Sequence, residues 1–267
     1  MTMTARSPKM IRSISAAALL LGTVLPATAQ DDAPPPPRRT RVILGPQLVP
    51  NNPGSDQVAL RPYIDVARVR GDGPFAYEAP DESSGISIYN RDGLSIGPAF
   101  GFEGKRRSRD TGGLDEVGFT VELGASVQYQ MRGPFRGFAE VRRGLGGHKG
   151  VIGMVGVDYV VRDADRWLVS VGPRLSVGDG RYARAYFGVT PRESATTGIA
   201  AYRPDALVMV GATTSALRQL NDRWGVFGYA KYDRIVGDAA DSPVTRRFGT
   251  RNQLSGGLGV SYTFGRQ

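Results

Sequence analysis

Apolar and polar residues alternate along most of this chain. In residues 117–131 every odd position is apolar or aromatic, whereas the even positions carry only Gly, Thr, Glu, Ser or Gln. An amphipathic helix repeats its apolar positions every three or four residues, so alternation over this length excludes one. The same period of two recurs in most other segments of the chain. The pattern therefore predicts an all-β protein.

We predict twelve strands, several of them bounded by turn-forming residues. Compositions typical of hairpin turns lie at 90–93, 132–134 and 178–180, and no segment shows sustained helical periodicity. The first and third strands have the weakest patterns, so ten strands is the alternative count. The predicted strands are 41–49, 57–69, 84–89, 93–102, 116–131, 135–143, 149–161, 166–177, 182–190, 206–219, 223–236 and 253–264.

The length and composition of these strands indicate what surrounds the sheet. Strands of soluble proteins average about 5–6 residues, whereas a strand that crosses a membrane needs about 9–11, and most of the predicted strands reach that length. The positions between the apolar ones are rich in Gly, Ser, Thr and Gln, as on the lumenal wall of an outer-membrane barrel. We therefore predict an antiparallel transmembrane β-barrel, closed as an up-and-down meander because unpaired sheet edges are costly in lipid. The alternative is a secreted soluble β-sandwich.

The first residues of the chain have the composition of an export signal. Three basic residues precede an apolar run at 14–25, and small side chains at 27–29 resemble a cleavage site. We interpret residues 1–29 as a signal peptide, since a membrane-spanning helix needs about 20 apolar residues. Consecutive prolines then favour an extended segment that cannot join a sheet. The expected organisation is a signal peptide at 1–29, a Pro-rich arm at 30–40 and an outer-membrane barrel at 41–267.

The composition limits the kinds of chemical site that the chain can form. Its 267 residues include no cysteine and one histidine, which excludes disulfides, thiolate metal sites and any site that needs two histidines. Lysine and arginine number 34 against 25 acidic residues, for a formal net charge of +9. In an exported chain this excess favours contacts with lipopolysaccharide, murein or lumenal solutes over nucleic acid. The arginines that strand phase places on the lumenal face are Arg61, Arg174, Arg184 and Arg234, and a basic cluster in a predicted loop is Arg106, Arg107 and Arg109.

Candidate catalytic and metal-binding residues are few. His148 lies in a glycine-rich turn at 144–150, and nothing in the sequence identifies a nucleophile or carboxylate that would act with it. The same glycines lack the spacing of a nucleotide-binding loop. Asp238 and Asp241 lack the alternating ligands of a calcium loop, so we interpret them as part of a solvated loop. We predict no catalytic residue, cofactor or metal site, and no enzyme.

Several short segments, in this order along the chain, resemble the signatures of one family. They are Pro-Asn-Asn-Pro-Gly-Ser-Asp at 50–56, Gly-Pro at 97–98, Gly-His-Lys-Gly at 147–150, Tyr-Phe-Gly-Val at 186–189, Ala-Tyr-Arg-Pro at 201–204 and Gly-Asp-Ala-Ala-Asp-Ser-Pro at 237–243. On these segments the chain is similar to the MipA/OmpV family of outer-membrane proteins. The family-motif residues, to which the resemblance assigns no role, are His148, Lys149, Gly150, Tyr186, Phe187, Gly188, Tyr202, Asp238, Asp241, Ser242 and Pro243.

The resemblance implies a function as well as a fold. It implies a non-enzymatic scaffold for murein-remodelling enzymes, which binds a lytic transglycosylase together with a murein synthase. We expect the Pro-rich arm and the periplasmic turns to make these contacts, and outer-membrane lipid and lipopolysaccharide to surround the barrel. Other members of the family are porin-like, and the candidate lumenal arginines leave a small diffusion channel with a basic lumen as the alternative. Neither hypothesis involves nucleic acid, and the sequence does not fix the oligomeric state.

Overall fold

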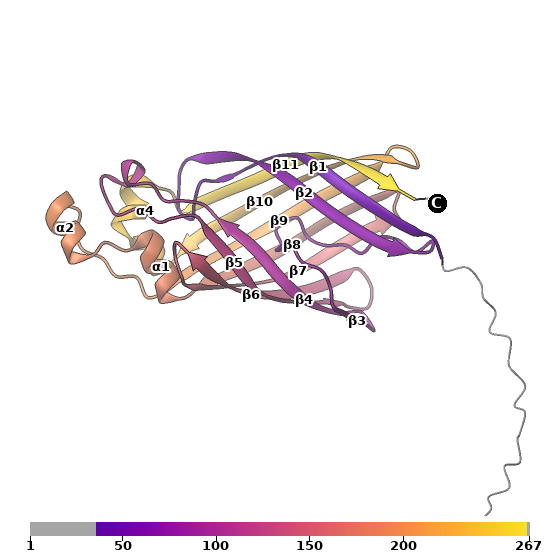
Figure 1. Ribbon diagram of the computed structural model, residues 1–267, viewed down its shortest axis with the longest axis horizontal. Coiled ribbons are helices and arrows are strands. Elements are labelled where there is room, and N and C mark those ends of the chain that lie inside the picture. Colours follow the sequence, from indigo (N-terminus) through magenta and orange to yellow (C-terminus); the bar gives the residue numbers. More distant parts are fainter. Residues whose placement is uncertain (1–35, 266–267) are drawn as a thin grey trace, which may run out of the picture. The chain divides into compact units, whose positions relative to one another are not determined.

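The computed structural model describes residues 36–265 of the chain (Figure 1). The predicted signal peptide, most of the Pro-rich arm and the last two residues lie outside this range. The part of the chain from Pro36 onward forms one compact unit. That unit is built on a single antiparallel β-sheet.

The sheet has eleven strands in the order of a meander. Along the sheet the strands follow one another as β2-β1-β11-β10-β9-β8-β7-β6-β5-β4-β3, so hairpins join β3 through β11 and the first strand pairs with the last. The predicted all-β antiparallel architecture is confirmed. The strands are β1 (Arg38–Pro50), β2 (Val58–Arg70), β3 (Tyr89–Arg91), β4 (Leu94–Glu103), β5 (Thr120–Gln130), β6 (Phe135–Gly146), β7 (Val151–Asp163), β8 (Trp167–Gly178), β9 (Leu207–Gln219), β10 (Trp224–Val236) and β11 (Asn252–Phe264).

The two edges of the sheet are β2 and β3, and no ladder joins them within residues 36–265. We call the line between β2 on one side and β3 and β4 on the other the seam. Within residues 36–265 the strand count is eleven rather than the predicted twelve, and the sheet has the form of a half-barrel.

Burial alternates along the strands, and many of the buried positions carry polar side chains. In β8, Val169 and Val171 are 47% and 51% exposed, whereas Ser170 and Arg174 are 1% and 3% exposed. Large apolar side chains are exposed on the outer face, while the inner face buries Asp, Glu, Arg, Ser and Thr side chains together with an apolar cluster that includes Ile43, Leu168 and Phe227. A soluble sheet buries its apolar face, so this pattern is that of a sheet whose outer face meets lipid. The predicted assignment of the two faces is confirmed.

The start of the first strand and the end of the last strand lie at the same end of the sheet. Thr40 of β1 pairs with Phe264 of β11, and we call this end the terminal end. The hairpin turns here are short. Between β3 and β4, for example, the turn consists of Asp92 and Gly93, both with positive φ. In outer-membrane barrels the short turns face the periplasm.

The opposite end of the sheet, which we call the capped end, carries the long connections (Figure 1). The helices that the structure describes all lie in these connections, and none of them is long and apolar enough to cross a membrane. Long loops of outer-membrane barrels face the exterior. The helices are η1 (Ser108–Thr111), α1 (Gly180–Phe187), α2 (Pro191–Thr197), α3 (Asp238–Asp241) and α4 (Pro243–Phe248).

Helix α1 occupies the position of the strand predicted at 182–190, and that prediction was wrong. The Asp179 side chain caps the helix by accepting a hydrogen bond from the Tyr182 backbone N–H at 2.8 Å. Tyr182 and Tyr186 are four residues apart, a spacing that suits alternation in a strand and also one turn of a helix. Arg184 therefore lies on a helix and not on the lumenal face of a strand.

The connection between β2 and β3 folds against the inner face of the sheet. We call residues 72–83 the inner segment. The exposed residues 84–88 that follow it run beside β4, with an isolated bridge between Ser84 and Phe100, but only Tyr89–Arg91 pairs as a strand. Pro98 of β4, which lies opposite these residues, lacks a backbone N–H group and opposes a continuous ladder. The strand predicted at 84–89 is therefore corrected to a short strand at 89–91, preceded by residues that hydrogen-bond to β4 through Ser84 and Ile88.

Candidate functional site: a charged lumen beneath a helical cap

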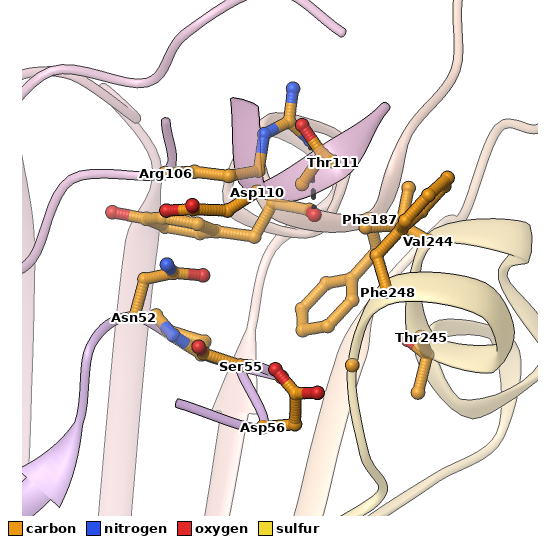
Figure 2. Close-up of a pocket in the computed structure, with 14 residues that line it drawn as sticks. Asn52, Ser55, Asp56, Arg106, Asp110, Thr111, Phe187, Val244, Thr245 and Phe248 are labelled. Atoms are coloured by element: carbon orange, nitrogen blue, oxygen red, sulfur yellow. Dashed lines mark hydrogen bonds between the residues drawn. The ribbon is translucent and has the colours of Figure 1, made fainter. Parts of the chain in front are cut away.

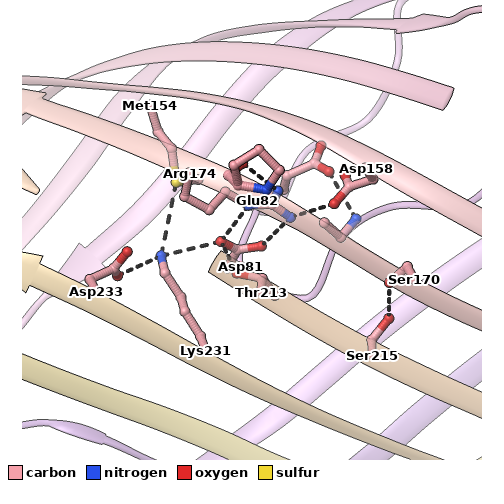
Figure 3. Close-up of polar contacts among 12 residues, drawn as sticks. Asp81, Glu82, Met154, Asp158, Ser170, Arg174, Thr213, Ser215, Lys231 and Asp233 are labelled. Atoms are coloured by element: carbon pink, nitrogen blue, oxygen red, sulfur yellow. Dashed lines mark hydrogen bonds and ion pairs between the residues drawn. The ribbon is translucent and has the colours of Figure 1, made fainter. Parts of the chain in front are cut away.

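Two carboxylates hold the inner segment against the wall of the sheet, and the first is Asp81 (Figure 3). Asp81 accepts hydrogen bonds from Arg174 Nε at 3.0 Å and from Thr213 Oγ1 at 2.9 Å. Lys231 Nζ lies 3.2 Å from the same carboxylate. Strands β8, β9 and β10 thus each contribute one partner to Asp81.

Glu82 is the second anchor. Arg136 of β6 approaches its two oxygens at 2.5 and 2.8 Å, a fork geometry that binds carboxylates strongly. Asp158 of β7 links the two anchors, since it lies 2.7 Å from Arg174 and 3.5 Å from Arg136. These side chains are at most 5% exposed, and buried charges are tolerated where they are paired and hydrogen-bonded.

Neutral groups extend these contacts along the inner segment. The Tyr77 hydroxyl donates to Ser170 Oγ at 2.6 Å. The Ser83 backbone N–H donates to Glu140 Oε2 at 3.0 Å. The inner segment therefore contacts consecutive strands from β6 to β10 and occupies the lumen between them.

The four arginines assigned to the lumen by strand phase have different locations. Arg174 is buried and Arg61 is half-buried, both on the inner face. Arg234 is exposed on the outer face because it shares the phase of Tyr232 in β10, and Arg184 lies on α1. The buried cations around the inner segment face carboxylates. Polypeptide thus occupies the lumen, and the charges around the inner segment are paired, which does not match the open basic channel of the alternative hypothesis.

His148 is buried at the capped end, within the turn between β6 and β7. Its Nε2 lies 3.0 Å from Glu122 Oε1, and its Nδ1 accepts a hydrogen bond from the Gly150 N–H at 3.1 Å. Because Nδ1 is an acceptor, the ring proton of the neutral form is on Nε2 and is donated to Glu122. Both ring nitrogens are used in these contacts, which leaves neither free to act as a base.

Arg142 connects this histidine site to the inner segment. Its Nε donates to Glu122 Oε2 at 2.8 Å. Its Nη1 donates to Ser83 Oγ and to Glu140. A continuous polar path therefore runs from His148 at the capped end to the inner segment in the lumen.

The aromatic face of α1 packs onto His148. The ring centroids of His148 and Tyr182 are 4.6 Å apart, and those of Tyr182 and Tyr186 are 5.2 Å apart. The Tyr182 hydroxyl donates to Glu103 Oε2 at 3.1 Å. Burial raises the pKa of Tyr182 well above its ordinary value, and the nearby Glu103 carboxylate raises it further. Tyr182 is therefore a neutral hydrogen-bond donor at physiological pH.

The family-motif residues come from separate loops that meet at the capped end. Ser242 Oγ donates to the Phe187 carbonyl at 2.6 Å, which joins α4 to α1. The Tyr202 hydroxyl donates to the Asp238 carbonyl at 2.9 Å. Other motif residues shape the backbone of the same loops: Lys149 has a φ of 51°, Gly188 ends α1 and Pro243 begins α4. The motif thus builds the cap.

The two aspartates considered for calcium belong to helix α3 rather than to a solvated loop. Asp241 Oδ1 lies 2.8 Å from Arg246 and 3.0 Å from Arg251, so arginines neutralise it. Among residues 36–265 no group of three or more His, Asp or Glu side chains is arranged to hold a metal ion.

Arg106 ties the connection between β4 and β5 to α1 (Figure 2). This arginine is 4% exposed, and its guanidinium donates to the carbonyl oxygens of Tyr186 at 3.1 Å and Asp115 at 2.7 Å. The cavity beside it has a volume of about 20 Å³, which is room for about one or two waters. Arg106 therefore has a structural role in the cap, and this cavity is too small for a ligand.

Helix α2 begins with a complete capping box. Thr190 Oγ1 accepts a hydrogen bond from the Glu193 N–H at 3.2 Å, and Glu193 Oε2 accepts one from the Thr190 N–H at 2.8 Å. Glu193 Oε1 also accepts from the Asp115 N–H at 3.0 Å. Burial alone would raise the pKa of Glu193, but these hydrogen bonds hold it below its usual value.

A groove with a volume of about 520 Å³ lies at the terminal end. We call it the terminal groove. It lies between the turns that join β7 to β8 and β9 to β10. Its charged side chains surround Leu220, which is 64% exposed. The lining residues are Arg39, Asp72, Ala164, Asp165, Arg166, Arg218, Gln219, Leu220, Asn221 and Asp222.

Of the strand residues that hold the inner segment, sequence analysis identified Arg174 as lumenal and missed the others. Arg136, Asp158 and Lys231 are charged residues at lumenal positions of long strands, and such residues need partners inside the barrel. Charged residues at lumenal strand positions were therefore the sequence signal that could have identified Arg136, Asp158 and Lys231. Asp81 and Glu82 carry no comparable signal, because they lie in a connection without periodicity.

The family model described as MltA-interacting protein MipA matches residues 42–264. No curated protein sequence matches the chain. Among solved structures, OprB of Pseudomonas putida matches with 13% identity and a TM-score of 0.38, over 66% of this chain and 46% of OprB. The chain thus spans less than half the length of OprB.

Two further structures cover most of both chains at lower identity. Neisserial surface protein A matches with 9% identity and a TM-score of 0.27, over 85% of this chain and 95% of that one. The outer membrane protein OprG of Pseudomonas aeruginosa matches with 8% identity and a TM-score of 0.29, over 86% and 97%.

Proposed function

The chain belongs to the MltA-interacting protein MipA family, and from this we propose that it is a non-enzymatic scaffold of the outer membrane. Its partner is a murein lytic transglycosylase, the class of enzyme for which the family is named. The partner binds at the terminal end, in the terminal groove and on the turns beside it. A murein synthase is the second partner that such a scaffold brings to the same place.

The inside-out burial of the sheet supports a location in the membrane. Exposed apolar side chains on the outer face and buried charges on the inner face suit lipid outside and a polar interior. The N-terminal residues 1–29 supply the export signal in this proposal. With the short turns toward the periplasm, the terminal end faces the compartment that holds murein.

The terminal groove is the observation that carries the scaffold proposal. It combines three arginines, three aspartates and an exposed leucine at the end that faces the periplasm. Protein interfaces commonly have an apolar centre within a charged rim, and the rim charges select the partner. Arg39 of β1 lines this groove, and the Pro-rich arm at 30–40 makes a second contact with the partner in this proposal.

The test is binding of a purified lytic transglycosylase to the folded protein in mild detergent. Arg166 and Arg218 line the terminal groove with exposed side chains. We expect the double variant Arg166→Glu/Arg218→Glu to weaken binding by about tenfold or more, because reversed rim charges repel the partner.

The matched control is Arg192→Glu/Arg203→Glu, two exposed arginines of the capped end. This variant changes the net charge equally, and we expect it to bind like the natural protein. Equal binding by both variants would show that the terminal groove is not the docking surface. Failure of the natural protein to bind any lytic transglycosylase would contradict the scaffold proposal itself.

The arm is tested separately by deleting residues 30–37. If the deletion leaves partner binding unchanged, the arm has no part in the interface, and the groove alone carries it.

A further inference from the structure

The seam is narrow at the capped end, where the connection between β1 and β2 packs against the end of β4. Arg61 of β2 donates from Nη2 to the Asn51 carbonyl at 3.0 Å. Gly104, which follows β4, approaches the same carbonyl so closely that any side chain there would collide with it. Although no ladder joins β2 to β4 in the described part of the chain, loop contacts close the seam at this point.

A cavity of about 350 Å³ opens at this point, and we call it the seam notch. It lies at the capped end, away from the terminal groove. Its lining residues are Asn51, Ala59, Arg61, Phe102, Gly104, Lys105, Arg107, Asp110 and Phe119.

One half of the seam notch is cationic. Arg61, Lys105 and Arg107 line it, and within residues 36–265 neither Lys105 nor Arg107 has an ion-pair partner. The acid of the lining, Asp110, pairs with Arg109 at 3.5 Å. Lys105 and Arg107 are therefore available for an anionic ligand beside Arg61, and exposed unpaired cations at one spot favour such a ligand.

The other half of the seam notch is aromatic and faces outward. The rings of Phe102 and Phe119 stack with centroids 5.9 Å apart. The two residues are 62% and 48% exposed on the outer face of the sheet. A cationic site thus lies directly beside exposed aromatic surface, at the level where long loops meet the outer leaflet.

We propose that the seam notch binds a phosphate-bearing glycolipid of the outer leaflet, of the lipid A type. Its phosphate lies among Arg61, Lys105 and Arg107, where charge-assisted hydrogen bonds hold it. Its acyl chains lie along Phe102 and Phe119 and bury their apolar surface. Along the seam, β2 has backbone N–H and C=O groups without a strand partner. Lipid tails cannot form hydrogen bonds with these groups, whereas sugar hydroxyl and amide groups of the headgroup can.

The proposal is tested by titrating the purified full-length protein in detergent with diphosphoryl lipid A and counting bound lipid by native mass spectrometry. We expect Lys105→Gln/Arg107→Gln to bind lipid A at least about tenfold more weakly, since each lost hydrogen bond to a charged group is worth about that factor. Both side chains are exposed and make no ion pair or hydrogen bond within residues 36–265, so we expect the variant to fold normally.

Two further measurements separate the halves of the site. We expect Phe102→Ala/Phe119→Ala to weaken lipid A binding. Inorganic phosphate should displace lipid A from this variant no better than from the natural protein. Lipid A from which the phosphates have been removed is expected to bind at least about tenfold more weakly to the natural protein.

The matched control is Arg192→Gln/Arg203→Gln, which removes two cations from the same end of the molecule and should bind lipid A normally. Unchanged lipid A binding by Lys105→Gln/Arg107→Gln would overturn the proposal. Displacement of lipid A by inorganic phosphate at equal concentration would also overturn it, because the site would then recognise free phosphate. The scaffold proposal concerns the opposite end and stands or falls on its own test.

Discussion

Gly150 lies where the turn between β6 and β7 comes closest to helix α1. A Cβ atom at this position would lie 2.4 Å from the Tyr182 backbone nitrogen and 2.6 Å from Asp179 Oδ1. These two atoms form the capping hydrogen bond of α1. Close packing against α1 therefore requires a glycine at this motif position. Helix α1 occupies the position of the strand predicted at 182–190.

We expect Gly150→Ala to destabilise α1 by about 1 kcal/mol or more, because loss of an N-cap alone costs about that much. Hydrogen exchange of residues 180–187 in detergent measures the effect as faster exchange. Gly118→Ala is the control, since a Cβ there would meet only the Gly147 Cα, at 3.9 Å. Equal exchange in both variants would contradict this account of Gly150.

Glu193 gives a prediction about pH. Its pKa in the folded protein lies below the ordinary 4.5, so its contribution to stability is complete above pH 4.5 and is lost as the pH falls through the folded-state value. The difference in exchange protection of α2 between the natural protein and Glu193→Gln should therefore be largest at neutral pH and shrink below pH 4.5. A difference that stays constant down to about pH 3 would refute this role.

At the scale of elements, the sequence predicts the strands well because lipid demands apolar side chains at alternate positions. β5, β7 and β8 lie within a few residues of their predicted ranges. The helices of the cap were missed, although α2 carries readable signals in Thr190, Pro191 and Glu193, a capping box with proline at the first turn. The inner segment could not be predicted, because its contacts join residues far apart in the chain and follow no period.

The inner segment depends on the charges of Asp81 and Glu82. Removing one partner of a buried ion pair costs about 3–5 kcal/mol, so we expect Asp81→Asn/Glu82→Gln to release the segment from the wall. In a planar bilayer the natural protein should show no lasting ion current. The double variant should show repeated channel openings, because the released segment no longer fills the lumen.

The control for this experiment is Asp72→Asn/Glu78→Gln, which replaces two exposed acidic residues of the same segment by their amides. It should remain as closed as the natural protein. A steady current through the natural protein would instead favour the diffusion channel, and closed behaviour of both variants would show that these ion pairs do not hold the lumen shut.

At the scale of the whole molecule, the two ends of the sheet should face different compartments. The chain has no cysteine, so a single introduced cysteine is a unique label. In intact cells a membrane-impermeant maleimide should label Arg203→Cys at the capped end, and it should label Arg166→Cys at the terminal end only after the outer membrane is permeabilised. The reverse result would place the terminal groove outside the cell and remove it from contact with murein.

Strand β1 pairs on one side with β2 and on the other with β11, the final strand of the sheet. Thr40 and Phe264 are register partners, and contacts between such distant positions form late because closing a long loop is entropically unfavourable. During folding, the first hairpin must therefore wait for the final strand before it can join the sheet. A chain that is cut or stalled before β11 leaves that hairpin tethered only through the inner segment, with both edges open to proteases and to mispairing. The first strand can therefore join the sheet only after the final strand has been synthesised and paired.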